Sequence, residues 1–120
     1  MESFDNYIKL EYLQFQKSPY VKSRSLSDWI IEIQSELNEL KIAINNEDKD
    51  NIVEELGDVF SDIIHSIIKA ENLNYCTLDQ VINNIYDKIT RRKPWLLDDE
   101  PPKTIEDELL IWNYIKTTEK

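Results

Sequence analysis

The fold is decided by residues 50–70, which read DNIVEELGDVFSDIIHSIIKA. Apolar residues recur at helical spacing through this stretch and predict one continuous helix. The helix contains Gly57, the only glycine in the chain, and a glycine inside a helix costs about 1 kcal/mol relative to alanine. Glu55 and Asp58 flank it on one helix face. Either this is an ordinary surface helix, or Gly57 lets a neighbouring helix pack closely behind a pair of carboxylates, and we expect the second.

Outward from this helix, the rest of the chain favours an all-α fold. The 120 residues include one glycine and four prolines, so few positions interrupt the helical spacing of the apolar residues. We predict further helices over residues 3–16, from a cap at Ser25 or Ser27 to about residue 44, from a cap at Thr77 to about residue 93, and from a cap at Thr104 onwards. Residues 18–26 and 94–103 are predicted to be irregular connections.

Two apolar stripes are expected to face inwards in a helical bundle. The first consists of Ile30, Ile33, Leu37, Leu40 and Ile44, and the second of Leu78, Val81, Ile82, Ile85 and Ile89. Spacings of three and four residues place each stripe on one helix face. A single helical hairpin of this size cannot bury both of its faces, so we predict at least a dimer.

Composition narrows the classes of partner. The formal net charge of −10 argues against a nucleic-acid backbone or an anionic membrane as a partner. The single cysteine, Cys76, permits no disulfide within the chain, which fits a reducing compartment. No apolar run approaches the roughly 18 residues that span a bilayer, and no signal-peptide pattern opens the sequence. We therefore expect a soluble, cytoplasmic protein.

Four carboxylates form the most informative pattern. Glu36 and Glu39 share one helix face, and Glu55 and Asp58 share another. If the two helices lie side by side and antiparallel, all four carboxylates can converge on one volume. Such an oxygen-rich environment is what Mg²⁺ or Mn²⁺ prefers. The alternative, that all four side chains point into water, stays open at this stage.

A basic cluster ends the helix that follows Thr77. Lys88 and Arg92 are four residues apart, so they share a helix face and can grip one phosphate group. Arg91 and Lys93 add charge beside them. The alternative is that these cations only offset the negative end of the helix dipole.

Taken in order, these motifs resemble the MazG-type nucleoside triphosphate pyrophosphohydrolases of the all-α superfamily. The family's acidic motif, Glu-Glu-x-x-Glu followed by Glu-x-x-Asp, resembles residues 35–39 (SELNE) and 55–58 (ELGD). Its Lys-x-x-Arg-Arg-x-Pro is matched by residues 88–94 (KITRRKP), and its Trp-x-x-Ile-Lys-x-x-Glu by residues 112–119 (WNYIKTTE). The Cys-Pro-Trp of the family resembles residues 18–20 (SPY), so the resemblance covers roughly residues 18–119.

The resemblance implies a helical bundle, assembled as a homodimer or homotetramer, that hydrolyses an NTP or dNTP between the α and β phosphates. The products would be a nucleoside monophosphate and pyrophosphate. The cofactor would be Mg²⁺, with Mn²⁺ as the other candidate. The metal ligands carried over, which are also the catalytic residues, are Glu36, Glu39, Glu55 and Asp58. The substrate-binding residues carried over are Lys88, Arg91, Arg92, Trp112, whose ring would stack on the base, and Lys116.

The chain departs from the family pattern at one acidic position. Ser35 stands where the motif has its first Glu, and Glu32, one turn earlier, is the nearest acidic replacement. If the lost carboxylate is needed, the alternative is a catalytically weakened helical homo-oligomer that serves as an interaction module.

We divide the chain into a helical extension, residues 1–17, and a MazG-like domain, residues 18–120.

Histidine and tryptophan carry weaker signals. His65, three residues after Asp62, suggests a di-iron bundle, but such a site needs a second Glu-x-x-His and this chain has one histidine. We therefore expect His65 to be a partly exposed helix residue. Trp29 and Trp95 are expected in the core or in an interface.

Overall fold

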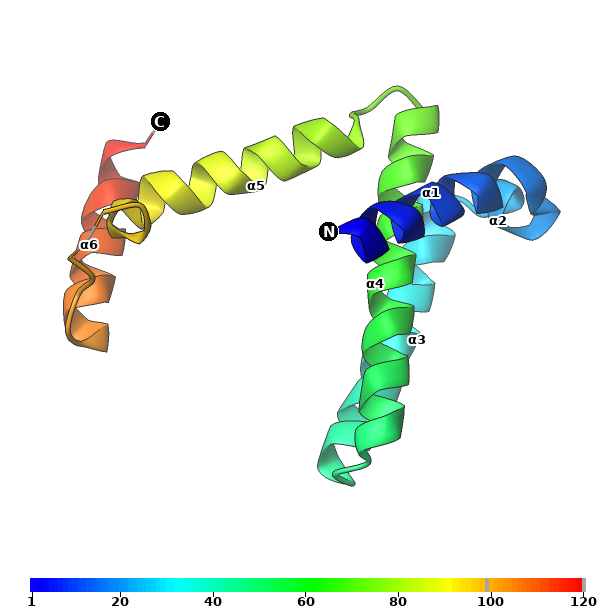
Figure 1. Ribbon diagram of the computed structural model, residues 1–120, viewed down its shortest axis with the longest axis horizontal. Helices are drawn as coiled ribbons and strands as arrows, with labels where there is room; N and C mark the ends of the chain where they lie inside the picture. The colour runs from blue at the N-terminus through cyan, green and yellow to red at the C-terminus, as the bar shows by residue number, and fades with distance from the viewer. Residues whose placement is uncertain (99, 120) are drawn as a thin grey trace. The chain divides into compact units, whose positions relative to one another are not determined.

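The computed structural model describes residues 1–98 and 100–119, and every regular element in them is helical (Figure 1). The elements are α1 (Glu2–Lys17), α2 (Pro19–Ser23), α3 (Leu26–Asn45), α4 (Lys49–Asn72), α5 (Leu78–Arg92), a short 3₁₀ helix η1 (Pro94–Leu96) and α6 (Ile105–Thr118). The predicted all-α class is confirmed. Residues 99 and 120, which fall in the predicted connection and in the predicted MazG-like domain, lie outside the described residues.

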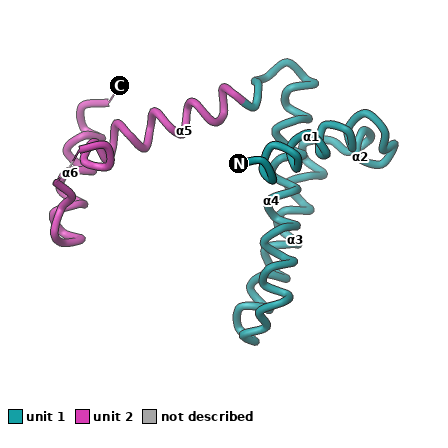
Figure 2. Tube along the Cα trace, in the orientation of Figure 1, with its two compact units in different colours: residues 1–78 teal, residues 79–120 magenta. Residues whose placement is uncertain are grey.

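The chain forms two compact units, residues 1–78 and residues 79–120 (Figure 2). The first unit contains α1 to α4, and the second contains nearly all of α5 together with η1 and α6. The acidic residues singled out from the sequence lie in the first unit, and the basic ones lie in the second. Each unit is described below by itself.

An antiparallel hairpin of α3 and α4 is the main element of the first unit (Figure 1). Ser25 is the N-cap of α3: its hydroxyl oxygen accepts a hydrogen bond from the Asp28 amide, and the Asp28 carboxylate accepts one from the Ser25 amide. This reciprocal capping box satisfies two amides that the helix start leaves free. Asp48 is the N-cap of α4, and its carboxylate accepts a hydrogen bond from the Asn51 backbone amide. The sequence offered Ser25 and Ser27 as possible N-caps of α3, and in the structure the N-cap is Ser25.

The core of the first unit combines residues of α1, α2, α3 and α4. Its buried members are Phe15, Val21, Trp29, Ile64 and Ile68. Tyr7, Ile8, Tyr12 and Ile67 pack against this cluster while partly exposed. Fully burying a large apolar side chain contributes about 1.5–3 kcal/mol, so α1 contributes to the core and does not merely precede it. The prediction that Trp29 lies in a core is confirmed.

The predicted irregular connection at residues 18–26 is wrong in part, because it contains the short helix α2. Ser18 caps this helix by accepting a hydrogen bond from the Val21 amide at 3.2 Å. Pro19 occupies its first position, where a proline loses no helical hydrogen bond and its fixed φ angle favours the helix. A serine followed by a proline is thus a helix start here and not only the end of α1.

The expected close approach at Gly57 is also wrong. A Cβ atom added at this position would meet no other heavy atom within 4 Å. Gly57 instead helps to line an open apolar cavity of about 370 Å³ with Met1, Ser3, Phe4, Tyr7 and Phe60. The rings of Phe4 and Tyr7 contact the ring of Phe60, one turn after the glycine.

The two apolar stripes do not face inwards within this chain. In α3, Ile30, Leu37 and Ile44 are about half exposed, and the buried residues are Trp29 and Ala43. In α5, no residue is buried, and Ile82, Ile85 and Ile89 are exposed. For α3 the physical reason is geometric: in the described residues its main neighbour is α4, which covers one side of the helix and leaves the opposite side exposed.

The second unit is held together by contacts between the end of α5 and α6. Lys93 forms an ion pair with Glu108 at 3.6 Å, and both Arg91 and Arg92 contact Glu119. Thr104 caps α6 by accepting a hydrogen bond from the Asp107 amide, as its sequence position predicts. The predicted connection at residues 94–103 contains η1 at its start.

None of the helices in the described ranges combines the length and the apolar composition that crossing a bilayer requires.

Candidate metal centre

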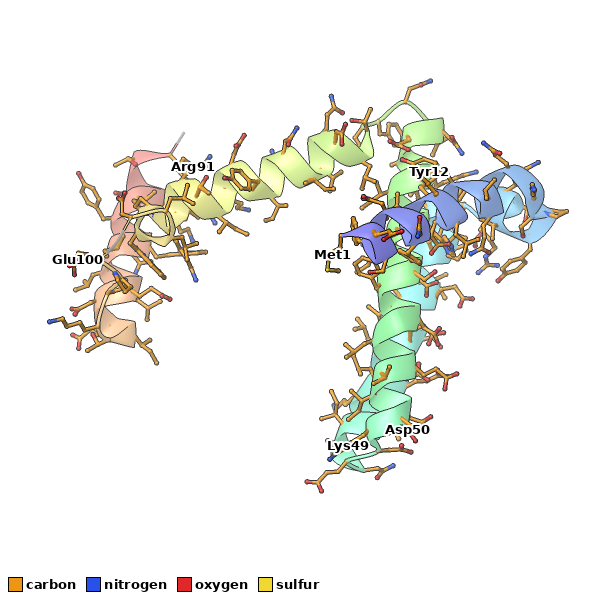
Figure 3. All side chains as sticks on the ribbon, in the orientation of Figure 1. Met1, Tyr12, Lys49, Asp50, Arg91 and Glu100 are labelled. Atoms are coloured by element: carbon orange, nitrogen blue, oxygen red, sulfur yellow. The ribbon has the colours of Figure 1, made fainter. Side chains whose placement is uncertain are left out.

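Three of the four predicted metal ligands come together between α3 and α4. Carboxylate oxygens of Glu36, Glu39 and Glu55 all lie within 4.8 Å of one another. Asp58, one turn after Glu55 on α4, is not within that spacing of all three, although its charge acts on Glu36. The antiparallel hairpin therefore produces the convergence that the spacing of the two acidic pairs allows. Figure 3 shows the side chains along these two helices.

Crowding of these carboxylates changes their acidity. Burial, a hydrogen bond with Glu55 and the charges of Asp58, Glu39 and Glu55 together raise the pKa of Glu36 to about 8. The hydrogen bond with Glu36 lowers the pKa of Glu55, but desolvation and the effects of Glu39 and Asp58 outweigh it, so that pKa is raised too. Protons or a cation must therefore offset the repulsion among these groups.

The donor set fits a hard divalent cation. Oε2 of Glu36 and Oε2 of Glu55 are both buried and have no hydrogen-bond partner. A buried carboxylate oxygen without a partner is costly unless another group or an ion satisfies it. Because the donors that converge here are all oxygen atoms, the site suits Mg²⁺ or Mn²⁺ better than a thiolate-preferring metal.

A second acidic group shares Glu36 with the first. Carboxylate oxygens of Glu32, Glu36 and Asp62 lie within 4.8 Å of one another. Glu32 is thus close to the face where Ser35 offers no carboxylate, but Arg24 already contacts its Oε1 at 3.2 Å. Burial raises the pKa of Asp62, and the charges of Glu32, Asp58 and Glu11 oppose its ionisation further. The acidic cluster therefore extends by one turn beyond the predicted ligands.

His65 is buried, which corrects the prediction that it is partly exposed. Only 6% of the residue is accessible, and its ring lies 4.5 Å from the ring of Trp29 between centroids. Nε2 of His65 lies 2.9 Å from Oε1 of Glu11, a residue that is 1% exposed. Nδ1 has no hydrogen-bond partner and lies 3.9 Å from Oδ1 of Asp62.

Glu11 is the buried residue that sequence reasoning missed. Its carboxylate accepts hydrogen bonds from Tyr7, from Ser61 at 2.5 Å and from Gln14 at 2.6 Å, in addition to its contact with His65. Burial alone would raise its pKa, but the hydrogen bonds from Ser61, Tyr7 and His65 prevail and lower it. The sequence does carry a signal for the burial of Glu11, because this residue lies on the same helix face as the apolar positions of residues 3–16.

The predicted substrate-binding residues lie in the second unit. Arg91 and Arg92 both contact Glu119, and the guanidinium carbon of Arg92 lies 5.1 Å from the centre of the Trp112 ring. The structure thus brings Arg91, Arg92 and Trp112 together. Lys88 on α5 and Lys116 on α6 are exposed.

Comparison with known proteins identifies the family. Residues 23–97 match the model of the MazG nucleotide pyrophosphohydrolase domain. The chain is 38% identical over 97 residues to the "Uncharacterized protein YabN" of Bacillus subtilis (strain 168). It is 32% identical over 96 residues to the "Nucleoside triphosphate pyrophosphohydrolase/pyrophosphatase MazG" of Thermotoga maritima.

The matches cover a large share of this chain but a small share of the two relatives. The matches cover 81% and 80% of this chain but only 19% of YabN and 35% of the Thermotoga protein. The crystal structure of a MazG-related protein from Thermotoga maritima superposes with a TM-score of 0.88 at 26% identity. That superposition covers 94% of this chain and 98% of the other. The chain therefore belongs to the MazG nucleotide pyrophosphohydrolase domain family.

Proposed function

We propose that the chain hydrolyses nucleoside or deoxynucleoside triphosphates between the α and β phosphates and releases a monophosphate and pyrophosphate. The observation that supports this most is the group of converging carboxylate oxygens on Glu36, Glu39 and Glu55. Two of these residues have buried oxygens without a partner. A protein that only needed a soluble surface would gain nothing from gathering like charges there. Family membership supports the same reaction class.

Glu36, Glu39 and Glu55 would hold a divalent cation, Mg²⁺ or Mn²⁺, with Asp58 as the fourth ligand. Such an ion, when bound, offsets charge on the phosphoryl oxygens and makes a water molecule more acidic. A carboxylate of the cluster that is not committed to the ion orients the attacking water. Because phosphoryl transfer depends mainly on positioning and charge, no protein nucleophile is required.

The basic residues of the second unit would bind the substrate. The guanidinium groups of Arg91 and Arg92 match the geometry of phosphate oxygens, and Lys88 and Lys116 add point charges. Trp112 offers an aromatic face for the base. In the first unit, the ring of Tyr20 contacts Arg24 and is exposed.

We also propose that the working form is a homodimer or a homotetramer. The support comes from the apolar side chains that this chain leaves uncovered on α3, α4 and α5. They include Ile30, Leu37, Leu56, Ile82 and Ile85. A second copy of the chain could cover such faces as the core of a bundle does.

Pyrophosphate release from a panel of NTPs and dNTPs, with Mg²⁺ and with Mn²⁺, tests the proposed reaction. We expect turnover of at least one nucleotide by the wild-type chain. Asp58→Asn and Glu39→Gln should lose at least about 100-fold in kcat/KM, which corresponds to about 2.7 kcal/mol of transition-state stabilisation. Circular dichroism checks that these variants keep their helices.

Glu54→Gln is the matched control, because Glu54 precedes Glu55 but is exposed. It should turn over like the wild type. Absence of pyrophosphate release from every nucleotide with either cation would refute the proposed reaction. That result, combined with a stable oligomer, would favour the homo-oligomeric interaction module.

A further inference from the structure

The carboxylate of Glu119 contacts two neighbouring arginines at once. Nε of Arg91 donates to Oε2 of Glu119 at 2.6 Å. Nη2 of Arg92 donates to Oε1 at 3.0 Å, and Nε of Arg92 lies 3.3 Å from the same oxygen. Glu119 directly follows α6 as its C-cap, whereas the arginines end α5. Figure 3 shows Arg91 at this end of α5.

The contact of Glu119 with Arg92 is partly buried, whereas its contact with Arg91 is exposed. The side chains of Glu119 and Arg92 are 19% and 18% exposed, and that of Arg91 is 52% exposed. The hydrogen bonds from Arg92 and Arg91 lower the pKa of Glu119 to about 2. The carboxylate is therefore ionised throughout the physiological range and accepts charge-assisted bonds from both residues.

The contact fixes the arginines relative to α6. Arg92 also lies over the face of Trp112, a residue of α6, at 5.1 Å. Two cations on neighbouring residues repel each other, and a carboxylate that contacts both reduces this repulsion. Ordering an arginine side chain costs rotamer freedom. Glu119 imposes this order before any ligand arrives.

The contact leaves part of each guanidinium group available. Arg91 uses only Nε, and Arg92 uses Nε and Nη2. Both terminal nitrogens of Arg91 and Nη1 of Arg92 have no part in the contact. A guanidinium group can bind a phosphate oxygen through these nitrogens while its other edge stays on the carboxylate.

We infer that Glu119 is a positioning residue, which holds Arg91 and Arg92 with their unused nitrogens ready for the phosphate chain of the substrate. This inference rests on the proposed function, because the arginines are assigned to phosphate binding there. It differs from the opposite role, in which Glu119 occupies the arginines in place of phosphate and inhibits binding. The two roles predict opposite changes when the carboxylate is removed.

Glu119→Gln separates these roles, because it removes the charge while keeping the size of the side chain. We expect KM for the best nucleotide to rise about tenfold while kcat changes by less than about twofold, since positioning of a binding group acts on substrate affinity. Binding of tripolyphosphate, measured by calorimetry, should weaken by a similar factor. Glu119→Asp keeps the charge and should recover part of the lost affinity.

Glu108→Gln is the matched control. It removes the ion pair with Lys93, in the same unit, but leaves the contacts of Glu119 in place. This variant should keep the wild-type KM and tripolyphosphate affinity. Thermal unfolding of each variant shows whether the second unit has stayed folded.

Several outcomes would overturn the inference. An unchanged KM and an unchanged tripolyphosphate affinity in Glu119→Gln would show that the carboxylate positions nothing, and tighter binding would show that it competes with phosphate. If the wild type releases no pyrophosphate, the proposed function fails while tripolyphosphate binding still tests Glu119. A wild-type chain that neither turns over nor binds tripolyphosphate overturns both.

Discussion

At the scale of single residues, Glu36 connects the fold of the first unit with the proposed binding of a metal ion. It belongs to both acidic groups between α3 and α4, and one of its oxygens is buried without a partner. A residue in this position opposes folding when it is charged and no cation is present. The same residue should therefore control both the stability of the metal-free chain and its response to Mg²⁺.

Replacing Glu36 with Gln should stabilise the metal-free chain at high pH and abolish the stabilisation by Mg²⁺. The pKa of Glu36 rises from 4.5 to about 8 on folding, so its favourable contribution is complete below about 4.5 and is lost as the pH rises through about 8. Without Mg²⁺, the Tm of the wild type should fall between pH 6 and pH 9. Over the same range the Tm of Glu36→Gln should fall by about 2–5 °C less than that of the wild type.

Thermal unfolding at both pH values, with and without Mg²⁺, measures these differences. Glu54→Gln is again the control, because it removes one exposed carboxylate from the same helix. An equal Mg²⁺-induced rise in Tm for Glu36→Gln and for the wild type would exclude Glu36 as a ligand, since a cation stabilises only through the sites it occupies.

The charge of Glu11 affects stability in the opposite direction to that of Glu36, because it stabilises the folded chain. Its carboxylate is buried and accepts hydrogen bonds from Tyr7, Ser61 and Gln14. Glu11→Gln should lower the free energy of unfolding by about 3 kcal/mol, because it removes the buried charge that accepts these three hydrogen bonds. Urea unfolding at pH 7 measures the loss, and Glu2→Gln, at the exposed start of α1, is the control.

The pH dependence of this contribution follows from the lowered pKa of Glu11. A lowered pKa means that the stabilisation is present above the pKa of the unfolded chain and is lost as the pH falls through the pKa of the folded chain. The difference between wild type and Glu11→Gln should therefore shrink in acid. A difference that stays constant from pH 7 to pH 3 would contradict this account.

At the scale of elements, the start of α3 depends on one serine. The hydroxyl of Ser25 accepts a hydrogen bond from the Asp28 amide at 3.1 Å. Ser25→Ala should therefore cost about 1 kcal/mol in the free energy of unfolding, whereas Ser27→Ala, inside the helix and exposed, should be neutral or slightly stabilising. Urea unfolding of both variants checks the choice of cap, and equal losses would contradict it.

The elements also show what local patterns can predict. The spans of α1, α3, α4, α5 and α6 follow from helical spacing and from caps, because both depend on residues at most four positions apart. The same rule explains why α2 was missed: a five-residue helix is too short to show a period. Ser18 and Pro19 were its available signal, and they also mark the end of a preceding helix.

At the scale of the whole molecule, the uncovered apolar faces make a prediction about assembly. The wild-type chain should be a dimer or a tetramer by light scattering after size-exclusion chromatography. Ile85→Lys should shift the population towards monomer, because it places a charge on the exposed apolar stripe of α5. Asn83→Lys, an exposed polar position of the same helix, should keep the wild-type mass, and a monomeric wild type would contradict the proposed oligomer.

The sequence by itself determined the all-α class, the position of the long helices, the two acidic pairs and the family. These features arise from neighbours along the chain, so spacing reveals them. Only the tertiary structure decided that Glu11 meets His65, 54 positions away, that Gly57 faces open space, and that Glu36 is shared by two acidic groups. Spacing assigns a residue to a helix face, but the rotation of each helix against its neighbours selects which faces meet.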